Sequence, residues 1–126
     1  MRPKSLAEVV QRTLGGDSFD LCLANFLDEF YSGPNADALL TKPALLAQAL
    51  GERGKVQDAY LAATAEELAR SQSFRVPNWI HDAARTLHRP WFASPLAAMR
   101  AVLLLESPPA FRSRNLFISE NALSRA

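Results

Sequence analysis

The stretch DSFDLCLANFLDEFYSG, residues 17–33, decides the fold class of this chain. Its apolar residues recur at steps of three and four, the repeat of one helix face, while Asp20, Asp28 and Glu29 fall off that face. The apolar set is Phe19, Cys22, Leu23, Phe26, Leu27 and Phe30. Three phenylalanines at this spacing are typical of a core rather than of a cofactor site. The stretch therefore predicts an amphipathic helix packed on a hydrophobic core.

The remaining chain predicts further helices and no long strand. Ser5 and Glu8 have the spacing of a capping box, which starts a first helix with Leu6, Val9, Val10 and Leu14 on its apolar face. The predicted helices cover residues 5–14, 17–33, 36–40, 41–50, 55–73, 82–87 and 94–106, with a turn at 51–54 and an extended piece at 116–118. We therefore expect an all-α fold, a single compact multi-helix domain over residues 1–126 with about six to seven helices and an irregular C-terminal tail.

The alanine-rich helix expected over residues 55–73 carries apolar residues on two faces. One face holds Val56, Ala59, Tyr60 and Ala63, and the other holds Leu61, Ala65 and Leu68. A helix with two apolar faces packs between two neighbours, and small side chains allow a close approach. We expect this helix to lie between two groups of neighbouring elements.

Residues 94–106 form the most apolar stretch, since ten of the thirteen are Ala, Val, Leu, Met or Pro. Ser94 as N-cap and Pro95 at the first helical position predict where this helix begins. A helix without a polar face is typically buried. The sequence therefore predicts that residues 94–106 form the central buried helix.

Two large aromatics, Trp91 and Phe92, stand just before that helix between two prolines, in the stretch HRPWFASP. The position favours a plug of the core over a surface patch. We expect at least one of the two rings to be buried against Leu96 and Met99.

The composition is that of an ordinary globular protein: 126 residues, 48% hydrophobic and 21% charged. The single cysteine, Cys22, cannot form an internal disulfide, which is typical of a reducing compartment. The N-terminal stretch lacks the pattern of a signal peptide. The longest apolar stretch is interrupted by Arg100 and is shorter than the roughly 20 residues of a membrane span. We expect a cytoplasmic protein with no membrane partner.

Charge is distributed unevenly along the chain. Residues 1–84 carry eight Lys or Arg and eleven Asp or Glu, whereas residues 85–126 carry six Arg, no Lys and two Glu. Arginine binds carboxylates and phosphates through two parallel bonds and stacks on aromatic rings. Electrostatic attraction between the two halves of the fold would explain the same charge pattern.

The motifs of common enzymes are absent from the sequence. His81 and His88 are the only histidines, and no HExxH or CxxC accompanies them. GERG, residues 51–54, lacks the lysine, hydroxyl and preceding strand of a phosphate-binding loop. No GxSxG motif is present. The sequence therefore favours a non-enzymatic protein with no cofactor and no metal.

DNA binding is the alternative function that the sequence leaves open. Residues 41–70 have the outline of a helix-turn-helix, but the second helix is net acidic and rich in alanine. Recognition of DNA needs cations for phosphates and side chains that reach the base edges. The arginines of residues 85–125 could meet phosphate, and the stretch FRSRN places Arg112, Arg114 and Asn115 beside Phe111. Nucleic acid is thus a possible but less favoured partner, with the chain acting as a regulator of its own operon.

Aromatic and arginine residues alternate in the second half of the chain, and these residue types most often dominate protein interfaces. The candidate partner-binding residues are Trp79, Arg85, Arg89, Trp91, Phe92, Phe111, Arg112, Arg114, Asn115 and Phe117. Clusters of this kind also close ordinary cores through cation–π contacts, so a structural role stays open.

Three segments carry a resemblance to a known group: DAYLAATAEELAR, VPNWIHDAARTLHRPWFASP and LLLESPPAFRSRNLFISENAL, within about residues 58–123. This succession resembles small uncharacterised bacterial helical proteins with a PxW…PWFA…ESPxAFRxRxxF pattern. They are often encoded beside a nucleotidyltransferase-like protein, in a toxin–antitoxin-like arrangement. The chain departs from the group at NWIHDAAR, where Ile80, His81 and Ala83 replace an acidic residue and often a proline. The resemblance implies a protein-interaction module with an antitoxin-like role, whose partner is the product of the adjacent gene.

Overall fold

The computed structural model describes residues 1–125, and it confirms the all-α fold class, with 58% helix and a single two-stranded sheet in that range. The α-helices are α1 (Leu6–Leu14), α2 (Phe19–Ser32), α3 (Asp37–Leu40), α4 (Ala47–Leu50), α5 (Glu52–Ser71), α6 (Ala97–Glu106) and α7 (Pro109–Arg112). The 3₁₀ helices are η1 (Asn78–His81) and η2 (Ala83–Arg85), and the strands are β1 (Trp91–Phe92) and β2 (Leu116–Phe117).

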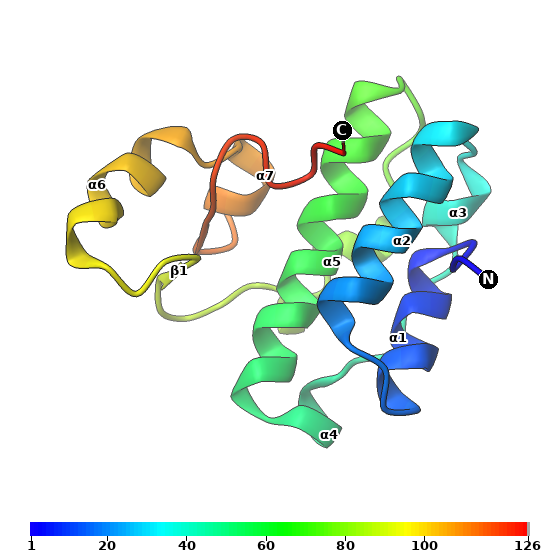
Figure 1. The fold of residues 1–126 in the computed structure, drawn as a ribbon, viewed down its shortest axis with the longest axis horizontal. Helices are drawn as coiled ribbons and strands as arrows, with labels where there is room; N and C mark the ends of the chain where they lie inside the picture. Colours follow the sequence, from blue (N-terminus) through cyan, green and yellow to red (C-terminus); the bar gives the residue numbers. More distant parts are fainter. Residues whose placement is uncertain (126) are drawn as a thin grey trace.

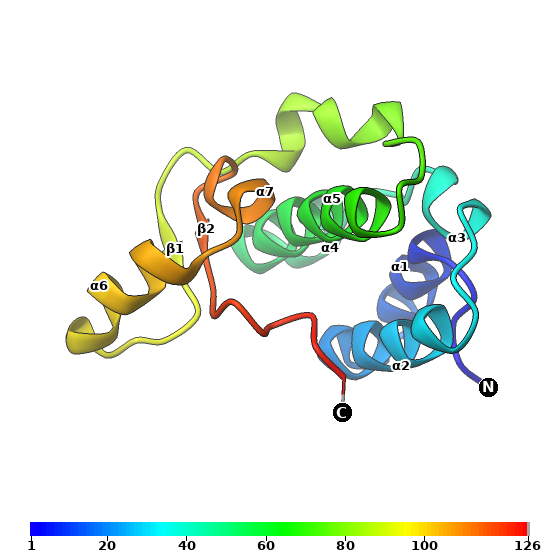
Figure 2. The ribbon, with the colours of Figure 1, turned by 90° about the horizontal axis from the view of Figure 1, so that it is seen from above.

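The long helix α5 runs through the middle of the molecule (Figure 1). Helices α1, α2 and α3 lie on one side of it, and β1, α6, α7 and β2 lie on the other, as Figure 2 shows from above. We call residues 1–85 the helical body and residues 86–118 the C-terminal arm. The last residues return to the body, where Arg125 pairs with Asp28 at 2.8 Å and Tyr31 donates a hydrogen bond to the Leu123 carbonyl.

Helix α2 buries the apolar stripe that its sequence predicts: all six members are buried in the larger core cluster. Helix α1 begins as predicted, because the Glu8 N–H donates to the Ser5 hydroxyl at 3.1 Å. The Glu8 carboxylate accepts instead from the Lys4 N–H, so the capping box is only half formed. Leu14 was expected on the buried face but is exposed, because the stripe continues through Thr13.

The two apolar faces of α5 are confirmed. Leu61, Ala65 and Leu68 join the larger cluster with α1 and α2. Ala59 and Ala63 join a second cluster with residues of α7 and β2, and Val56 and Tyr60 pack against it. Helix α5 therefore links the helical body to the C-terminal arm.

Residues 41–54 differ from the prediction. The predicted helix over 41–50 is reduced to the single turn of α4, and α5 begins at Glu52 because Gly51 takes a φ of +64°. The shortening of the predicted helix to α4 is explained by Asp58. Its buried carboxylate accepts hydrogen bonds from the N–H groups of Leu46 and Ala47 at 2.7 and 3.1 Å. These two hydrogen bonds to a residue of α5 fix where α4 begins. A one-turn helix also removes the helix-turn-helix outline.

Helix α6 is the largest correction, because it is not the central buried helix. It begins at Ala97 rather than Ser94, and only Leu103 is buried among its residues. Figures 1 and 2 show it at the end of the molecule, away from α1 to α3. Its position places the most apolar helix of the chain in solvent.

The strands β1 and β2 pair in parallel, with Trp91 opposite Leu116 and Phe92 opposite Phe117. The extended piece predicted at 116–118 is therefore confirmed, and its partner is the aromatic pair. Helices α6 and α7 form the connection between the two strands. The buried Ser107 hydroxyl donates to the Leu116 carbonyl at 2.8 Å, which fastens the end of α6 to β2.

Candidate functional site

The structure buries five of the ten predicted partner-binding residues, so these five side chains lie in the interior of the chain. These residues are Trp79, Arg85, Phe111, Arg114 and Phe117. Their contacts, described next, are internal to the molecule, in line with the structural role that the sequence also allowed.

Arg85 is fully buried and ties three segments together. Its guanidinium donates to the backbone carbonyls of Asp58 at 3.2 Å and Pro43 at 2.6 Å, and it lies 4.8 Å from the centre of the Trp79 ring. Trp79 donates to the Leu39 carbonyl at 2.9 Å. Burial raises the pKa of Asp58 above its ordinary value, although its hydrogen bonds and the nearby Arg85 charge act the other way. This cluster therefore stabilises the fold.

Arg114 joins the C-terminal arm to α5. It pairs with Glu66 at 2.9 Å and donates to the carbonyls of Ala110 and Ile80. Partial burial raises the pKa of Glu66, but the hydrogen bonds and charges of Arg114 and Arg70 outweigh it, so this pKa lies below its ordinary value. An arginine held in this way is not available to bind phosphate.

The two buried phenylalanines of the arm also have internal partners. The Phe111 ring meets the Tyr60 ring edge to face at 4.9 Å, and Phe117 stacks on Phe92 at 5.1 Å. The first contact joins α7 to α5, and the second joins the two strands. Aromatic pairs of this geometry contribute about 0.5–1.5 kcal/mol beyond the area they bury.

The other five candidates reach the surface to different extents. Arg89 and Arg112 are exposed, whereas Trp91, Phe92 and Asn115 are half-buried. Asn115 takes a φ of +64° and its amide donates to the Leu87 carbonyl at 2.7 Å, which holds the start of β2.

The prediction that Trp91 or Phe92 plugs the core beside Leu96 and Met99 is wrong. Both rings are half-buried, and both proposed neighbours are exposed. Phe92 lies between Phe117 and the Arg100 guanidinium, which is 5.2 Å from its centre. The rings therefore belong to the rim of the arm.

Helix α6 presents the main exposed apolar surface of the arm. The exposed fractions are 64% for Leu96, 37% for Met99, 40% for Val102, 44% for Leu104 and 84% for Leu105. Large side chains project from several sides of the helix, because only Leu103 faces β2 closely enough to be buried. Sequence reasoning identified this helix but predicted the opposite environment, so none of these residues was a candidate.

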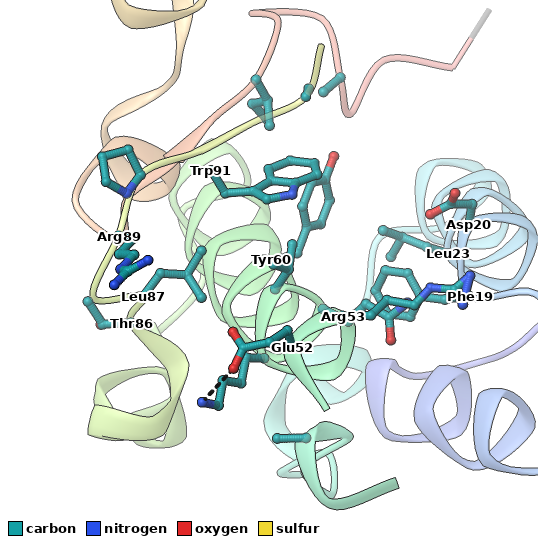
Figure 3. A pocket seen from close by; sticks show the side chains of 18 of the residues that line it. Phe19, Asp20, Leu23, Glu52, Arg53, Tyr60, Thr86, Leu87, Arg89 and Trp91 are labelled. Atoms are coloured by element: carbon teal, nitrogen blue, oxygen red, sulfur yellow. Dashed lines mark hydrogen bonds and ion pairs between the residues drawn. The ribbon is translucent and has the colours of Figure 1, made fainter. Parts of the chain in front are cut away.

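A second surface feature is a cleft of about 1260 Å³ between α2, the first half of α5 and the segment that leads into β1 (Figure 3). Phe19 and Leu23 of α2 line one side. Tyr60 of α5 and Trp91 of β1 line the other, together with Leu87. The cleft is therefore lined with apolar side chains from both the helical body and the arm.

Charged groups surround this apolar lining. Asp20 lies on α2, Arg53 on α5 and Arg89 before β1. Within the described part of the chain, none of the three forms an ion pair. Burial, and to a lesser extent the charge of Asp20, raises the pKa of Tyr60 to about 12, so its hydroxyl stays protonated near neutral pH. The cleft thus combines an apolar lining with a rim of both charge signs.

Of the cysteine and the two histidines, only His88 lines this cleft. Burial raises the pKa of the Cys22 thiol, which disfavours a reactive thiolate, and His81 and His88 are both exposed. Residues 1–125 contain no group of three or more His, Cys, Asp or Glu placed to hold a metal ion. No helix in the same range combines the length and apolar character needed to cross a membrane.

Comparison of the chain with family models, with curated proteins and with solved structures found no match.

Proposed function

We propose that this chain is a non-enzymatic protein-interaction module that binds a protein partner through α6. The observation that carries the proposal is the exposure of the most apolar helix of the chain, with Leu96 and Leu105 more than half exposed. Large apolar side chains gathered on one exposed helix mark an interaction site in a soluble protein.

The energetic argument rests on the same side chains. Full burial of a leucine contributes about 1.5–3 kcal/mol relative to exposure in water. Leu105 is mostly exposed, so most of this free energy is still to be gained when a partner buries it. Val102 and Leu104 are partly exposed and would gain part of it. A partner that covers α6 would gain this free energy without any rearrangement of the helical body.

The resemblance of residues 58–123 supports a particular partner, the nucleotidyltransferase-like product of the adjacent gene. Two exposed arginines, Arg89 and Arg112, belong to the same arm and would set orientation and association rate rather than most of the affinity. The mechanism is steric: the arm covers or restrains the partner, as in an antitoxin-like role.

Co-expression with the adjacent gene, followed by size-exclusion chromatography, tests this function. The two proteins are expected to co-elute, and the double substitution Val102→Glu, Leu105→Glu is expected to weaken the complex at least tenfold. Leu21→Glu is the matched control, because Leu21 is also an exposed leucine, at 62%, but lies on α2. Separate elution of the two wild-type proteins would contradict the proposal.

The DNA-binding alternative loses support from the fold. Arg85 and Arg114 are buried with internal partners, and the helix before α5 is a single turn. An unchanged electrophoretic mobility of its own promoter at low salt, where phosphate contacts are strongest, would exclude this alternative.

A further inference from the structure

The chain carries two uncovered apolar features, the helix α6 and the cleft beside α5. We infer that they are complementary, and that α6 of one copy lies in the cleft of a second copy to form a reciprocal homodimer. The inference rests on the proposed function, since both require α6 to be an interaction element, but it names an occupant for a different surface, the cleft.

The first argument is size. Helix α6 has ten residues, so it is about 15 Å long and, at a diameter of about 10 Å, occupies about 1,200 Å³. The cleft measures about 1260 Å³. This exceeds the roughly 300–1,000 Å³ of typical small-molecule pockets, so the cleft has the scale of a macromolecular segment rather than of a small ligand.

The second argument is chemistry. Val56, Tyr60, Leu87 and Trp91 line the cleft and are each half-buried, so an apolar helix would complete their burial. Docking of an apolar helix into a groove is a recurrent mode of recognition. Alanines at 97, 98 and 101 let the backbone of α6 approach such a lining closely.

The third argument is charge. The charged residues of α6 are Arg100 and Glu106, one of each sign. The cleft rim supplies Asp20, Arg53 and Arg89, none of which forms an ion pair with another residue in 1–125. The rim therefore offers a group of opposite sign to each charge on the helix, which favours one orientation of the docked helix.

The occupant must come from another molecule, because α6 is fastened to its own arm. Leu103 is buried toward β2, and the Ser107 hydroxyl binds the Leu116 carbonyl at 2.8 Å. Figure 1 shows α6 at the outer end of the arm, beyond the strands and away from α2, which forms one wall of the cleft. Movement of α6 into its own cleft would break these contacts.

The buried area is sufficient for a dimer. The wall of a helix about 15 Å long and 10 Å wide has an area of about 470 Å². If the cleft covers two thirds of each helix, two reciprocal insertions bury about 1,250 Å² counted on both partners, within the roughly 1,200–2,000 Å² of specific interfaces. Because the same two copies exchange helices with each other, the assembly closes with two-fold symmetry.

Multi-angle light scattering during size-exclusion chromatography of the purified full chain tests the inference. Wild-type protein is expected to have the mass of a dimer at tens of micromolar and to dissociate on dilution. The helix variant Val102→Glu, Leu105→Glu and the cleft variant Val56→Glu are each expected to be monomers. Leu21→Glu, on the outer face of α2, is expected to remain a dimer. A monomeric wild-type protein up to several hundred micromolar would overturn the inference.

Mixing the two variants gives the sharpest result. The helix variant keeps an intact cleft and the cleft variant keeps an intact helix, so an equimolar mixture is expected to form a heterodimer with one restored interface. A mixture that stays monomeric, or a cleft variant that still dimerises, would show that α6 pairs in another way and would overturn the proposal.

Circular dichroism would reveal whether Val56→Glu misfolds. A second cleft variant tests the cleft in that case. Arg53 is exposed, so Arg53→Glu should fold, and it is expected to raise the dissociation constant of the dimer about tenfold at low salt. An unchanged dissociation constant for this variant, with Val56→Glu unfolded, would count against the cleft as the docking site.

The dimer and the proposed function fail separately. A monomeric wild-type chain that still co-elutes with the adjacent gene product would refute the dimer alone. Because both proposals use α6, a chain that dimerises but does not bind that protein even after dilution to monomers would refute the proposed partner alone.

Discussion

In the helical body, apolar side chains at helical spacing are covered by neighbouring helices, whereas in the C-terminal arm the most apolar helix faces solvent. Phe26 of α2 and Leu105 of α6 mark the two extremes, with exposed fractions of 0% and 84%. The body is closed by two helices packed on α5, while the arm is a strand–helix–strand connection with few neighbours. Apolar composition therefore indicates burial only where the topology supplies a neighbour, and elsewhere it leaves an exposed apolar surface.

The largest loss in the free energy of unfolding is expected from a substitution at the junction between the two regions. Arg85→Met removes a buried cation, leaves the backbone carbonyls of Pro43 and Asp58 without this donor, and takes away the positive charge near the buried Asp58 carboxylate. Loss of one partner from a buried charged cluster costs about 3–5 kcal/mol. Urea denaturation should show this fall in the free energy of unfolding.

Arg112→Met is the control for that substitution. Arg112 is exposed in the arm, so its loss should change the free energy of unfolding by no more than about 0.5 kcal/mol. Equal effects of the two variants would mean that the Arg85 cluster does not hold the body.

A matched pair of leucines compares the two regions directly. Leu39→Ala should lower the free energy of unfolding by about 2–5 kcal/mol, because Leu39 is buried in the body and its loss leaves a cavity. Leu105→Ala in α6 should change the free energy of unfolding by no more than about 0.5 kcal/mol. Denaturation is followed at a concentration at which the chain is monomeric. A large loss from Leu105→Ala under these conditions would show that α6 is packed within its own chain.

A smaller effect is expected inside the arm from Ser107→Ala. The substitution leaves the buried Leu116 carbonyl without its hydroxyl donor, a cost of about 1–3 kcal/mol. Amide hydrogen exchange should speed up at Phe117 and Ile118, while α2 stays protected. Ser113→Ala removes an exposed hydroxyl that bonds only the Ala110 carbonyl at the end of α7, so exchange at Phe117 and Ile118 and in α2 should stay unchanged.

Local periodicity was enough to predict the parts of the fold whose contacts it determines. The buried stripe of α2 and the two faces of α5 follow from side-chain spacing alone. Residues 41–46 could not be predicted, because their conformation depends on Asp58, which lies twelve residues after Leu46. Local preference favoured a longer helix there, and a tertiary hydrogen bond overrode it.

The candidate site was harder to predict for a similar reason. Arginine and tryptophan look the same in sequence whether they face a partner or a core, and the burial of Arg85 depends on carbonyls 27 and 42 residues away. The cleft combines residues of α2, α5 and β1 and has no local signal. The apolar composition of α6 is compatible with a buried helix and with an exposed apolar surface. Only the topology, which gives α6 few neighbours, separates these two interpretations.

The smallest effect, and the finest test of how the arm is held to the body, concerns pH. The pair of Arg114 and Glu66 links the two regions at 2.9 Å. Because the folded-state pKa of Glu66 lies below its ordinary value of 4.5, the carboxylate stabilises the fold above that value. This stabilisation is lost as the pH falls through the lowered pKa. Glu66→Gln should therefore cost about 1 kcal/mol at pH 7.

The difference from wild type should shrink as the pH falls below 4.5, since protonated Glu66 and glutamine are both neutral. Urea denaturation at a series of pH values measures this convergence. Glu67→Gln, one residue along α5 and without an ion pair in the described chain, should run parallel to wild type throughout. Because Arg114 keeps its bonds to the Ala110 and Ile80 carbonyls, the arm should stay docked in Glu66→Gln. A pH-independent difference would show that packing, rather than this ion pair, joins the arm to α5.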